Sequence, residues 1–186
     1  MNISVFCASS HPCNPNIINA ASELGRSLAS AGHTLLYGGS NLGLMGIVSS
    51  AAMDCGGRVI AVIPTLFSED IILSQRVTEL VRVRSMAERK ELLLAESDAF
   101  IALPGGIGTI DEVSEVMVMN QLQIVDGRRV LDGSYQIKPM ILLDIDGFYT
   151  PFLEQLRVVK KEGLMRSDGG LVPVASVEEA MSLLHH

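Results

Sequence analysis

The stretch LPGGIGTIDE, from Leu103 to Glu112, follows an apolar run at Ala99–Leu103 and opens a long helical pattern. Its three glycines allow backbone N–H groups to approach a bound oxyanion closely, and the helix that follows directs the positive end of its dipole at the same point. A phosphate group fits such a cradle. The sequence therefore predicts a strand, a phosphate-binding turn and a helix, in this order.

Two carboxylates, Asp111 and Glu112, are expected in the first turn of that helix. A carboxylate placed there stabilises a cation or orients a water molecule. Thr109, followed three residues later by Glu112, is also the pattern of a capping box, which stabilises a helix start without any chemistry. Three glycines within four residues favour the ligand site, because each costs about 0.5–1 kcal/mol of backbone entropy relative to alanine and a cap needs none.

The composition indicates one compact domain without a membrane or nucleic-acid partner. The 186 residues suit a single domain, and a hydrophobic content of 48% is enough for a core. No apolar stretch reaches the roughly 18 residues that span a bilayer, and residues 1–10 lack the features of a secretory signal, so a cytoplasmic protein is expected. The net charge of −7 disfavours polymeric nucleic acid, whose binding needs a basic surface.

The cysteines and the terminal histidines do not indicate a metal site. Cys7, Cys13 and Cys55 are odd in number and lack metal-ligand spacing, so free or buried thiols are expected rather than disulfides or zinc. No metal and no cofactor is predicted. His185 and His186 are either native residues or the remnant of a purification tag, and no role is assigned to them.

Short apolar runs alternate with helical patterns along most of the chain. This alternation predicts a doubly wound parallel sheet with helices on both faces, a Rossmann-like α/β fold in a single domain over residues 1–186. Ligands bind such sheets beyond the carboxyl ends of the strands, where turns at residues 7–10, 38–46 and 104–109 are expected. The predicted strands are Ile3–Cys7, Thr34–Tyr37, Val59–Ile63, Leu80–Val83, Ala99–Leu103 and Met140–Leu143.

The second of these turns, YGGSNLGLMG from Tyr37 to Gly46, is only superficially like a dinucleotide fingerprint. Its glycines do not form GxGxxG, and the fingerprint proper opens on the first strand of a domain, so NAD or FAD is not expected. The glycines serve either helix–strand packing or ligand contact, and this segment alone does not decide between the two.

A third stretch, SMAERKELL from Ser85 to Leu93, begins with a capping pattern and carries Arg89 and Lys90 in its first turns. A basic pair on a helix is usually a solvated surface feature. This helix, however, leads directly into the strand that feeds the glycine-rich turn, so its start is expected at the ligand end of the sheet. There Arg89 can reach a phosphate or a departing base.

The combination of SMAERK with FIALPGGIGTIDEVSEV, preceded by VFCASS and YGGSNLGLMG, resembles the LONELY GUY (LOG) family of cytokinin riboside 5′-monophosphate phosphoribohydrolases. The resemblance extends from about Ile3 to Leu184. Such proteins were often labelled lysine decarboxylases. The chain does not support that label, because it lacks the arrangement of a Schiff-base lysine with aromatic or acidic partners that pyridoxal phosphate chemistry requires.

The resemblance implies hydrolysis of the N-glycosidic bond of an adenosine-type 5′-monophosphate to free base and ribose 5-phosphate. The transition state is oxocarbenium-like, so a carboxylate near the anomeric carbon stabilises it. Glu112 is the candidate, and Arg89 is by analogy the second catalytic residue. The other implied substrate-binding positions are Asp70, Lys90, Gly105, Gly106, Ile107, Gly108, Thr109, Asp111 and Glu115. Asp70 aligns with the family only across a one-residue gap, and for Glu115 a surface or structural role is equally open.

Two further segments bear on assembly. The helix after the glycine-rich turn is apolar almost all round at Val116–Met119, which is typical of a helix buried on more than one side. Because the resembled family is dimeric with this region near the interface, we expect a homodimer. The segment DGRRVLDGSYQI, Asp126–Ile137, is longer than the family's loop and is predicted to form a hairpin around Asp132–Gly133, as a lid, an oligomer contact or a tolerated insertion.

Four departures from the family pattern leave the preferred base open between prenylated and plain adenine. They are Asp111 for glutamate, Ile107 for an aromatic residue, Ser40 for glycine and Met119 for tryptophan. Two other functions stay open: a non-catalytic nucleotide or molybdenum-cofactor carrier or sensor of the same fold, and a broad nucleoside monophosphate nucleosidase. Glu112 beside Arg89 argues against a carrier, because a phosphate binder needs no acid next to the anion.

Overall fold

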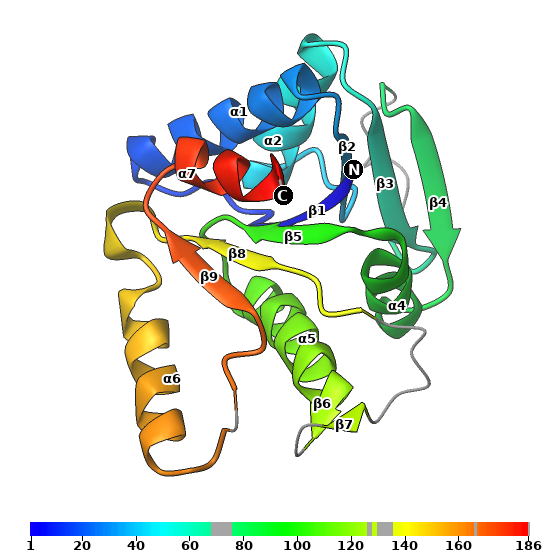
Figure 1. The fold of residues 1–186 in the computed structure, drawn as a ribbon. Coiled ribbons are helices and arrows are strands. Elements are labelled where there is room, and N and C mark those ends of the chain that lie inside the picture. Colours follow the sequence, from blue (N-terminus) through cyan, green and yellow to red (C-terminus); the bar gives the residue numbers. More distant parts are fainter. Residues whose placement is uncertain (68–75, 126–127, 130–135, 166, 186) are drawn as a thin grey trace.

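The computed structural model describes residues 1–67, 76–125, 128–129, 136–165 and 167–185. Its main element is a seven-stranded parallel sheet with the strand order β4-β3-β2-β1-β5-β8-β9 (Figure 1). The order runs outwards from β1 in both directions, so the sheet is doubly wound and the predicted Rossmann-like fold is confirmed. The strands are β1 (Asn2–Phe6), β2 (Thr34–Tyr37), β3 (Val59–Pro64), β4 (Glu79–Val83), β5 (Ala99–Ala102), β8 (Met140–Leu143) and β9 (Leu171–Val174).

Helices cover both faces of this sheet (Figure 1). One face packs against α1 (Pro15–Ser30), α2 (Gly43–Asp54) and α7 (Val177–Ser182), and the other against α4 (Met86–Glu96), α5 (Ile107–Gln123) and α6 (Thr150–Lys161). Two 3-10 turns, η1 (Ile145–Gly147) and η2 (Leu183–His185), follow β8 and α7. Within the described residues, every helix is too short or too polar to cross a bilayer.

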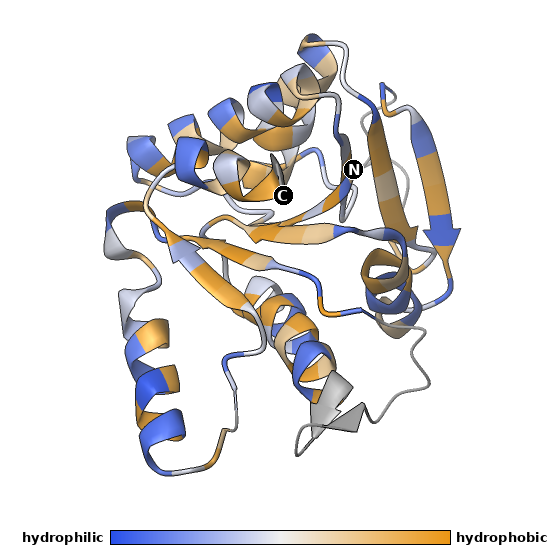
Figure 2. Ribbon diagram, viewed as in Figure 1, coloured by the Kyte–Doolittle hydropathy of each residue, from blue (hydrophilic) through white to orange (hydrophobic). Residues whose placement is uncertain are grey.

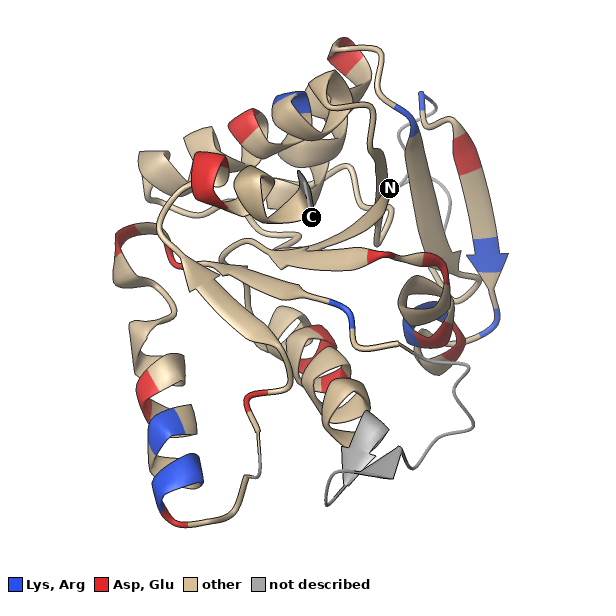
Figure 3. Cartoon of the chain, in the orientation of Figure 1, with Lys and Arg blue, Asp and Glu red and all other residues tan. Residues whose placement is uncertain are grey.

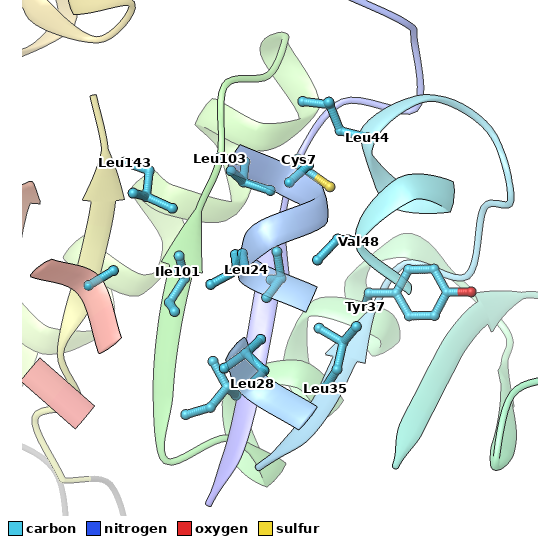
Figure 4. Packing of buried hydrophobic residues seen from close by; sticks show 14 of the residues in the cluster. Cys7, Leu24, Leu28, Leu35, Tyr37, Leu44, Val48, Ile101, Leu103 and Leu143 are labelled. Atoms are coloured by element: carbon cyan, nitrogen blue, oxygen red, sulfur yellow. The ribbon is translucent and has the colours of Figure 1, made fainter. Parts of the chain in front are cut away.

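Each face of the sheet has its own hydrophobic core. Side chains of β1, β2 and β5 meet those of α1 and α2 on one face, where Leu24, Leu28, Leu35 and Ile101 interdigitate (Figure 4). Phe6, Leu36 and Phe100 point to the other face and pack towards α4 and α5. The central strands are accordingly mostly apolar, as Figure 2 shows, because a parallel sheet is buried on both sides.

The structure adds two elements that the apolar runs did not indicate. The first, β9, pairs with β8 at the edge of the sheet, and its LVPV sequence includes Pro173, which only an edge strand tolerates. The second, α6, is an amphipathic surface helix. After α5 the chain forms a short antiparallel pair, β6 (Ile124–Val125) with β7 (Arg128–Arg129), whereas the hairpin expected around Asp132–Gly133 lies outside the described residues.

The capping-box alternative for Thr109 and Glu112 is wrong. The helix α5 begins at Ile107, two residues ahead of Thr109, and the Glu112 carboxylate accepts a hydrogen bond from Arg89 rather than closing a box. The capping signal at the start of α4 is real: the Ser85 hydroxyl accepts a hydrogen bond from the backbone N–H of Glu88 at 3.1 Å. It fixes the start of the helix that carries Arg89.

Candidate functional site

Four chain segments meet beyond the carboxyl ends of β1, β2 and β5 and enclose a pocket of about 270 Å³. They are the turn after β1, the start of α2, the start of α4 and the start of α5. This is the place where a doubly wound sheet binds its ligand, because the helices on either side of the central strands diverge there. The lining residues are Cys7, Ala8, Ser9, Ser10, Met45, Met86, Arg89, Gly106, Gly108, Thr109, Asp111 and Glu112.

A buried ion pair forms part of the lining of this pocket. The Arg89 guanidinium, in the first turn of α4, donates through Nη2 to Oε1 of Glu112 in α5, and the two residues are only 7% and 5% exposed. Burial raises the pKa of the Glu112 carboxyl, while the charge and hydrogen bond of Arg89 oppose that rise without cancelling it. The pair therefore joins a titratable acid to a fixed cation at one wall of the pocket.

The rest of the Arg89 guanidinium is only partly satisfied. Its Nη1 lies 3.9 Å from the sulfur of Met86, and its buried Nε has no hydrogen-bond partner among the described residues. An unsatisfied buried donor costs about 1–3 kcal/mol. Because Arg89 also lines the pocket, its guanidinium is suited to contact an anion or a heterocyclic nitrogen there.

The three glycines of the predicted cradle have two different roles. A Cβ added to Gly105 would lie 2.1 Å from the hydroxyl oxygen of Thr109, so Gly105 allows the turn to close on Thr109. A Cβ on Gly106 or Gly108 would meet nothing within 4 Å. These two glycines face open space in the pocket, at the amino-terminal end of α5, where backbone N–H groups attract an anion.

Lys90 lies beside the pocket and not on its wall. Its ammonium group contacts Asp111 Oδ2 at 3.1 Å and Glu115 Oε2 at 2.9 Å, and the hydrogen bond with Glu115 raises the pKa of Lys90. Lys90 therefore ties α4 to α5 next to the Arg89–Glu112 pair. Figure 3 shows the acidic residues on α5 and the mixed charges on α4 from which these contacts come.

The structure brings together most, but not all, of the predicted site. Arg89, Glu112, Gly106, Gly108, Thr109 and Asp111 line the pocket. Gly105, Lys90 and Glu115 do not line it. Ile107 is 82% exposed and does not line it either, and Asp70 lies outside the described residues. Across the described ranges, no three histidine, cysteine, aspartate or glutamate side chains gather as metal ligands.

Sequence reasoning assigned no individual role to six of the lining residues: Cys7, Ala8, Ser9, Ser10, Met45 and Met86. The first four form the turn after β1, which the strand pattern did place at the ligand edge. Nothing in the sequence marked the two methionines, because a methionine in an apolar helix is usually a core residue. Met86 is half-exposed and lies against Arg89, so it borders the pocket instead.

A doubly wound sheet with a glycine-rich pocket at its switch point defines a Rossmann-like α/β protein that holds its ligand at the carboxyl edge. Within that class, the chain belongs to the LOG family. The family model described as "Possible lysine decarboxylase" matches residues 45–185. Curated relatives with LOG names match over most of the chain.

Two of these relatives show the extent of the similarity. A cytokinin riboside 5′-monophosphate phosphoribohydrolase of Oryza sativa subsp. japonica is 38% identical over 174 residues, which is 94% of this chain and 67% of the relative. One of Arabidopsis thaliana is 39% identical over 163 residues, 88% of this chain and 71% of the relative. A further rice relative is 41% identical over 164 residues, which is 88% of this chain and 63% of the relative.

Solved structures share the fold. A molybdenum cofactor binding protein of Rippkaea orientalis has a TM-score of 0.70 at 24% identity, with 99% of this chain and 94% of that chain covered. A molybdenum cofactor carrier protein of Chlamydomonas reinhardtii has a TM-score of 0.71 at 23% identity and the same coverage. Likeness at this level of identity establishes the architecture alone.

Proposed function

We propose that the protein hydrolyses the N-glycosidic bond of adenosine-type nucleoside 5′-monophosphates, with cytokinin riboside 5′-monophosphates as the substrate class, and releases the free base and ribose 5-phosphate. The observation that carries the proposal is the buried Arg89–Glu112 pair beside a glycine-rich anion cradle in one pocket. The names of the curated relatives support the substrate class.

The phosphate is placed at the amino-terminal end of α5. The backbone at Gly106 and Gly108 faces open space there, and Thr109 lines the same wall with its hydroxyl group. Unpaired N–H groups and the helix dipole favour a dianion at this point, although the protein as a whole carries a charge of −7. A phosphate held here places the ribose near Glu112, which lies five residues after the start of α5 and lines the same pocket.

The chemistry follows from the charge that develops on the ribose. As the bond between C1′ and the base nitrogen breaks, the electron pair leaves with the base and positive charge builds on C1′ and the ring oxygen. The Glu112 carboxylate stabilises that charge and accepts a proton from the attacking water, whose oxygen bonds to C1′; this proton then passes to the departing base, which restores the carboxylate. The Arg89 guanidinium stabilises charge on the departing base or holds the substrate, and Asp111 and Glu115 orient Lys90 beside the pair.

A carrier of the same fold needs the cradle but not the acid. A carboxylate near a bound phosphate repels it, and burial of Glu112 adds a further cost, so the pair has no purpose in a protein that only binds an anion. The acid-and-cation pair favours turnover for this reason.

The decisive measurement is product release from matched substrates. Purified protein is incubated with AMP, with isopentenyladenosine 5′-monophosphate and with the two corresponding nucleosides, and free base and ribose 5-phosphate are quantified by chromatography. Release from the monophosphates alone is the expected result, because the nucleosides lack the group that the cradle holds. Nucleotide binding without release from any substrate would instead identify a carrier or sensor.

The Glu112→Gln variant tests the assigned role directly. It keeps the size of the side chain and removes its charge, so we expect turnover to fall by about 10²–10⁴-fold while nucleotide affinity, measured by calorimetry, stays close to that of the unchanged protein. Glu154→Gln, the same substitution at an exposed position of α6, serves as the control for the loss of one negative charge. A Glu112→Gln enzyme with most of its turnover would disprove the role.

We also propose that the chain forms a homodimer through α5. Val116 and Met117 are buried, as the sequence predicted, but Val118 is 51% exposed and Leu122 is 43% exposed in the single chain. A second copy would cover these apolar side chains. Light scattering coupled to size-exclusion chromatography tests this, and Val118→Lys is expected to shift the mass towards that of the monomer.

A further inference from the structure

We propose that Gly38 is a positioning residue: its backbone forms the surface on which the Arg89 guanidinium rests, and any side chain at this position would displace the guanidinium from Glu112. The consequence for activity rests on the proposed function, whereas the geometric claim is independent of it. This gives a specific role to one glycine of the YGG turn, for which sequence reasoning left packing and ligand contact as alternatives.

The evidence is the set of atoms that a side chain at Gly38 would meet. A Cβ built on Gly38 would lie 2.9 Å from Nη2, 3.0 Å from Cζ and 3.2 Å from Nη1 of Arg89. Its three nearest neighbours are thus all in one guanidinium group. Distances this short are rare between a Cβ and any heavy atom, so an alanine here forces the guanidinium to move.

The guanidinium has little room to move without losing its partner. Nη2 is bonded to Glu112, the Met86 sulfur lies against Nη1, and Arg89 as a whole is 7% exposed. A shift away from residue 38 therefore changes the contact with Glu112. Because the proposed reaction depends on the relative position of these two groups, misplacement by about 1 Å costs up to about 100-fold in rate.

The neighbouring glycines of the same turn serve the backbone instead. Gly39 and Gly43 have φ angles of +84° and +56°, which other residues rarely adopt, and a Cβ on Gly46 would lie 2.1 Å from a backbone oxygen. Gly38 does not have a positive φ, and the nearest atoms to a Cβ added there all belong to the end of the Arg89 side chain, not to the backbone. Gly38→Ala is therefore expected to fold normally and to disturb the site, not the chain path.

The test combines a titration with kinetics. In protein labelled with ¹³C at the glutamate side chains, the Glu112 carboxyl is titrated by NMR in the unchanged protein and in Gly38→Ala. The charge and hydrogen bond of Arg89 lower the pKa of Glu112, so displacement of the Arg89 guanidinium should raise that pKa further. The other titratable groups near Glu112, which are Asp111, Lys90, Cys7 and Tyr149, are the same in both proteins. We expect kcat to fall about 10-fold or more and the acidic limb of the kcat/KM profile to move to higher pH.

Two comparisons separate positioning from a general loss of structure. Gly57→Ala makes the same change at the opposite edge of the sheet, where the added Cβ would lie 2.6 Å from the Cβ of Ala29, and should leave the titration of Glu112 unchanged. In an Arg89→Lys background, Gly38→Ala should cause no further loss of kcat, because the two changes act through one group.

A Gly38→Ala protein with unchanged kcat and an unchanged Glu112 titration would overturn the proposal, as would an equal effect of Gly57→Ala. If the unchanged protein hydrolyses no nucleotide, the proposed function fails, and the NMR titration still decides whether Gly38 positions Arg89.

Discussion

The buried pair of Arg89 and Glu112 makes a quantitative prediction about stability. Replacing Glu112 with Leu leaves the Arg89 cation buried without a counter-charge, and replacing Arg89 with Met leaves the Glu112 carboxyl without its cation. Both residues are less than 9% exposed, so solvent screens neither charge effectively. Removal of one partner of a buried pair typically costs about 3–5 kcal/mol, so we expect each single variant to lose that much free energy of unfolding.

The double variant, Arg89→Met with Glu112→Leu, is expected to recover most of this loss. Apolar side chains of similar size carry no desolvation cost, and such replacements of buried pairs are often neutral or stabilising. For a chain of this length, about 3–5 kcal/mol corresponds to a fall in Tm of roughly 6–20 °C for each single variant. Function should be lost in all three.

Urea denaturation at pH 7, followed by circular dichroism, gives the four free energies of the double-mutant cycle, provided that the slope with denaturant is the same in all four proteins. Single variants that each cost less than about 1 kcal/mol, or a double variant whose loss equals the sum of the two, would refute the view that the pair is energetically coupled and buried.

Three other measurements follow from individual contacts. Burial raises the pKa of Glu112 above its ordinary value of 4.5, so the folded protein holds this proton more tightly than the unfolded chain. The resulting stability is present below pH 4.5 and is lost as the pH rises through the folded-state pKa. Urea titrations at several pH values should therefore show the free energy of unfolding of the unchanged protein falling, relative to that of Glu112→Gln, as the pH rises over that window, whichever protein is the more stable at pH 7. Tyr149→Phe should lower the free energy of unfolding, measured by thermal unfolding, by about 1–3 kcal/mol. The reason is that the Tyr149 hydroxyl donates a hydrogen bond of 2.7 Å to the buried carbonyl of Leu103, just ahead of the glycine-rich turn. An unchanged Tm would show that this carbonyl needs no partner. Gly43→Ala should lower the free energy of unfolding more than Gly32→Ala does. Both glycines have a positive φ, but only at Gly43 would the added Cβ lie within 2.5 Å of the backbone of Ser9 and Ser10. Equal losses of stability in the two variants would contradict the close approach of these two turns.

The central part of the fold was predictable because its signals are local. Each buried parallel strand is a short apolar run, and the starts of α1 and α4 carry side chains that cap them, Asn14 and Ser85. The edge strand β9 escaped prediction because it is only four residues long and contains Pro173, which argues against a strand. The start of α5 was predicted too late: Asp111 and Glu112 were expected in its first turn, whereas the helix begins at Ile107 and its first turn holds no acidic residue.

The candidate site was predictable where the chain itself brings the groups close, and not where the tertiary fold does. The glycine-rich turn and Glu112 are adjacent in sequence, so their proximity follows directly. Two other contacts depend on how α4, α5 and the end of β2 pack together. Lys90 is held by Asp111 and Glu115, and Gly38 lies against the guanidinium of Arg89. No spacing in the sequence encodes those contacts.

The three cysteines of the protein differ in how readily their thiols react with a chemical label. Cys7 lines the pocket but is 2% exposed, and both burial and the nearby Glu112 raise its pKa, so its sulfur stays protonated and a poor nucleophile. Cys13 and Cys55 are exposed and free. A maleimide fluorophore therefore attaches to these two cysteines, and in a Cys55→Ser variant it attaches to Cys13 alone. Cys13 lies three residues beyond Ser10, which lines the pocket. The emission of the fluorophore there can report the binding of a ligand without any chemical change inside the pocket.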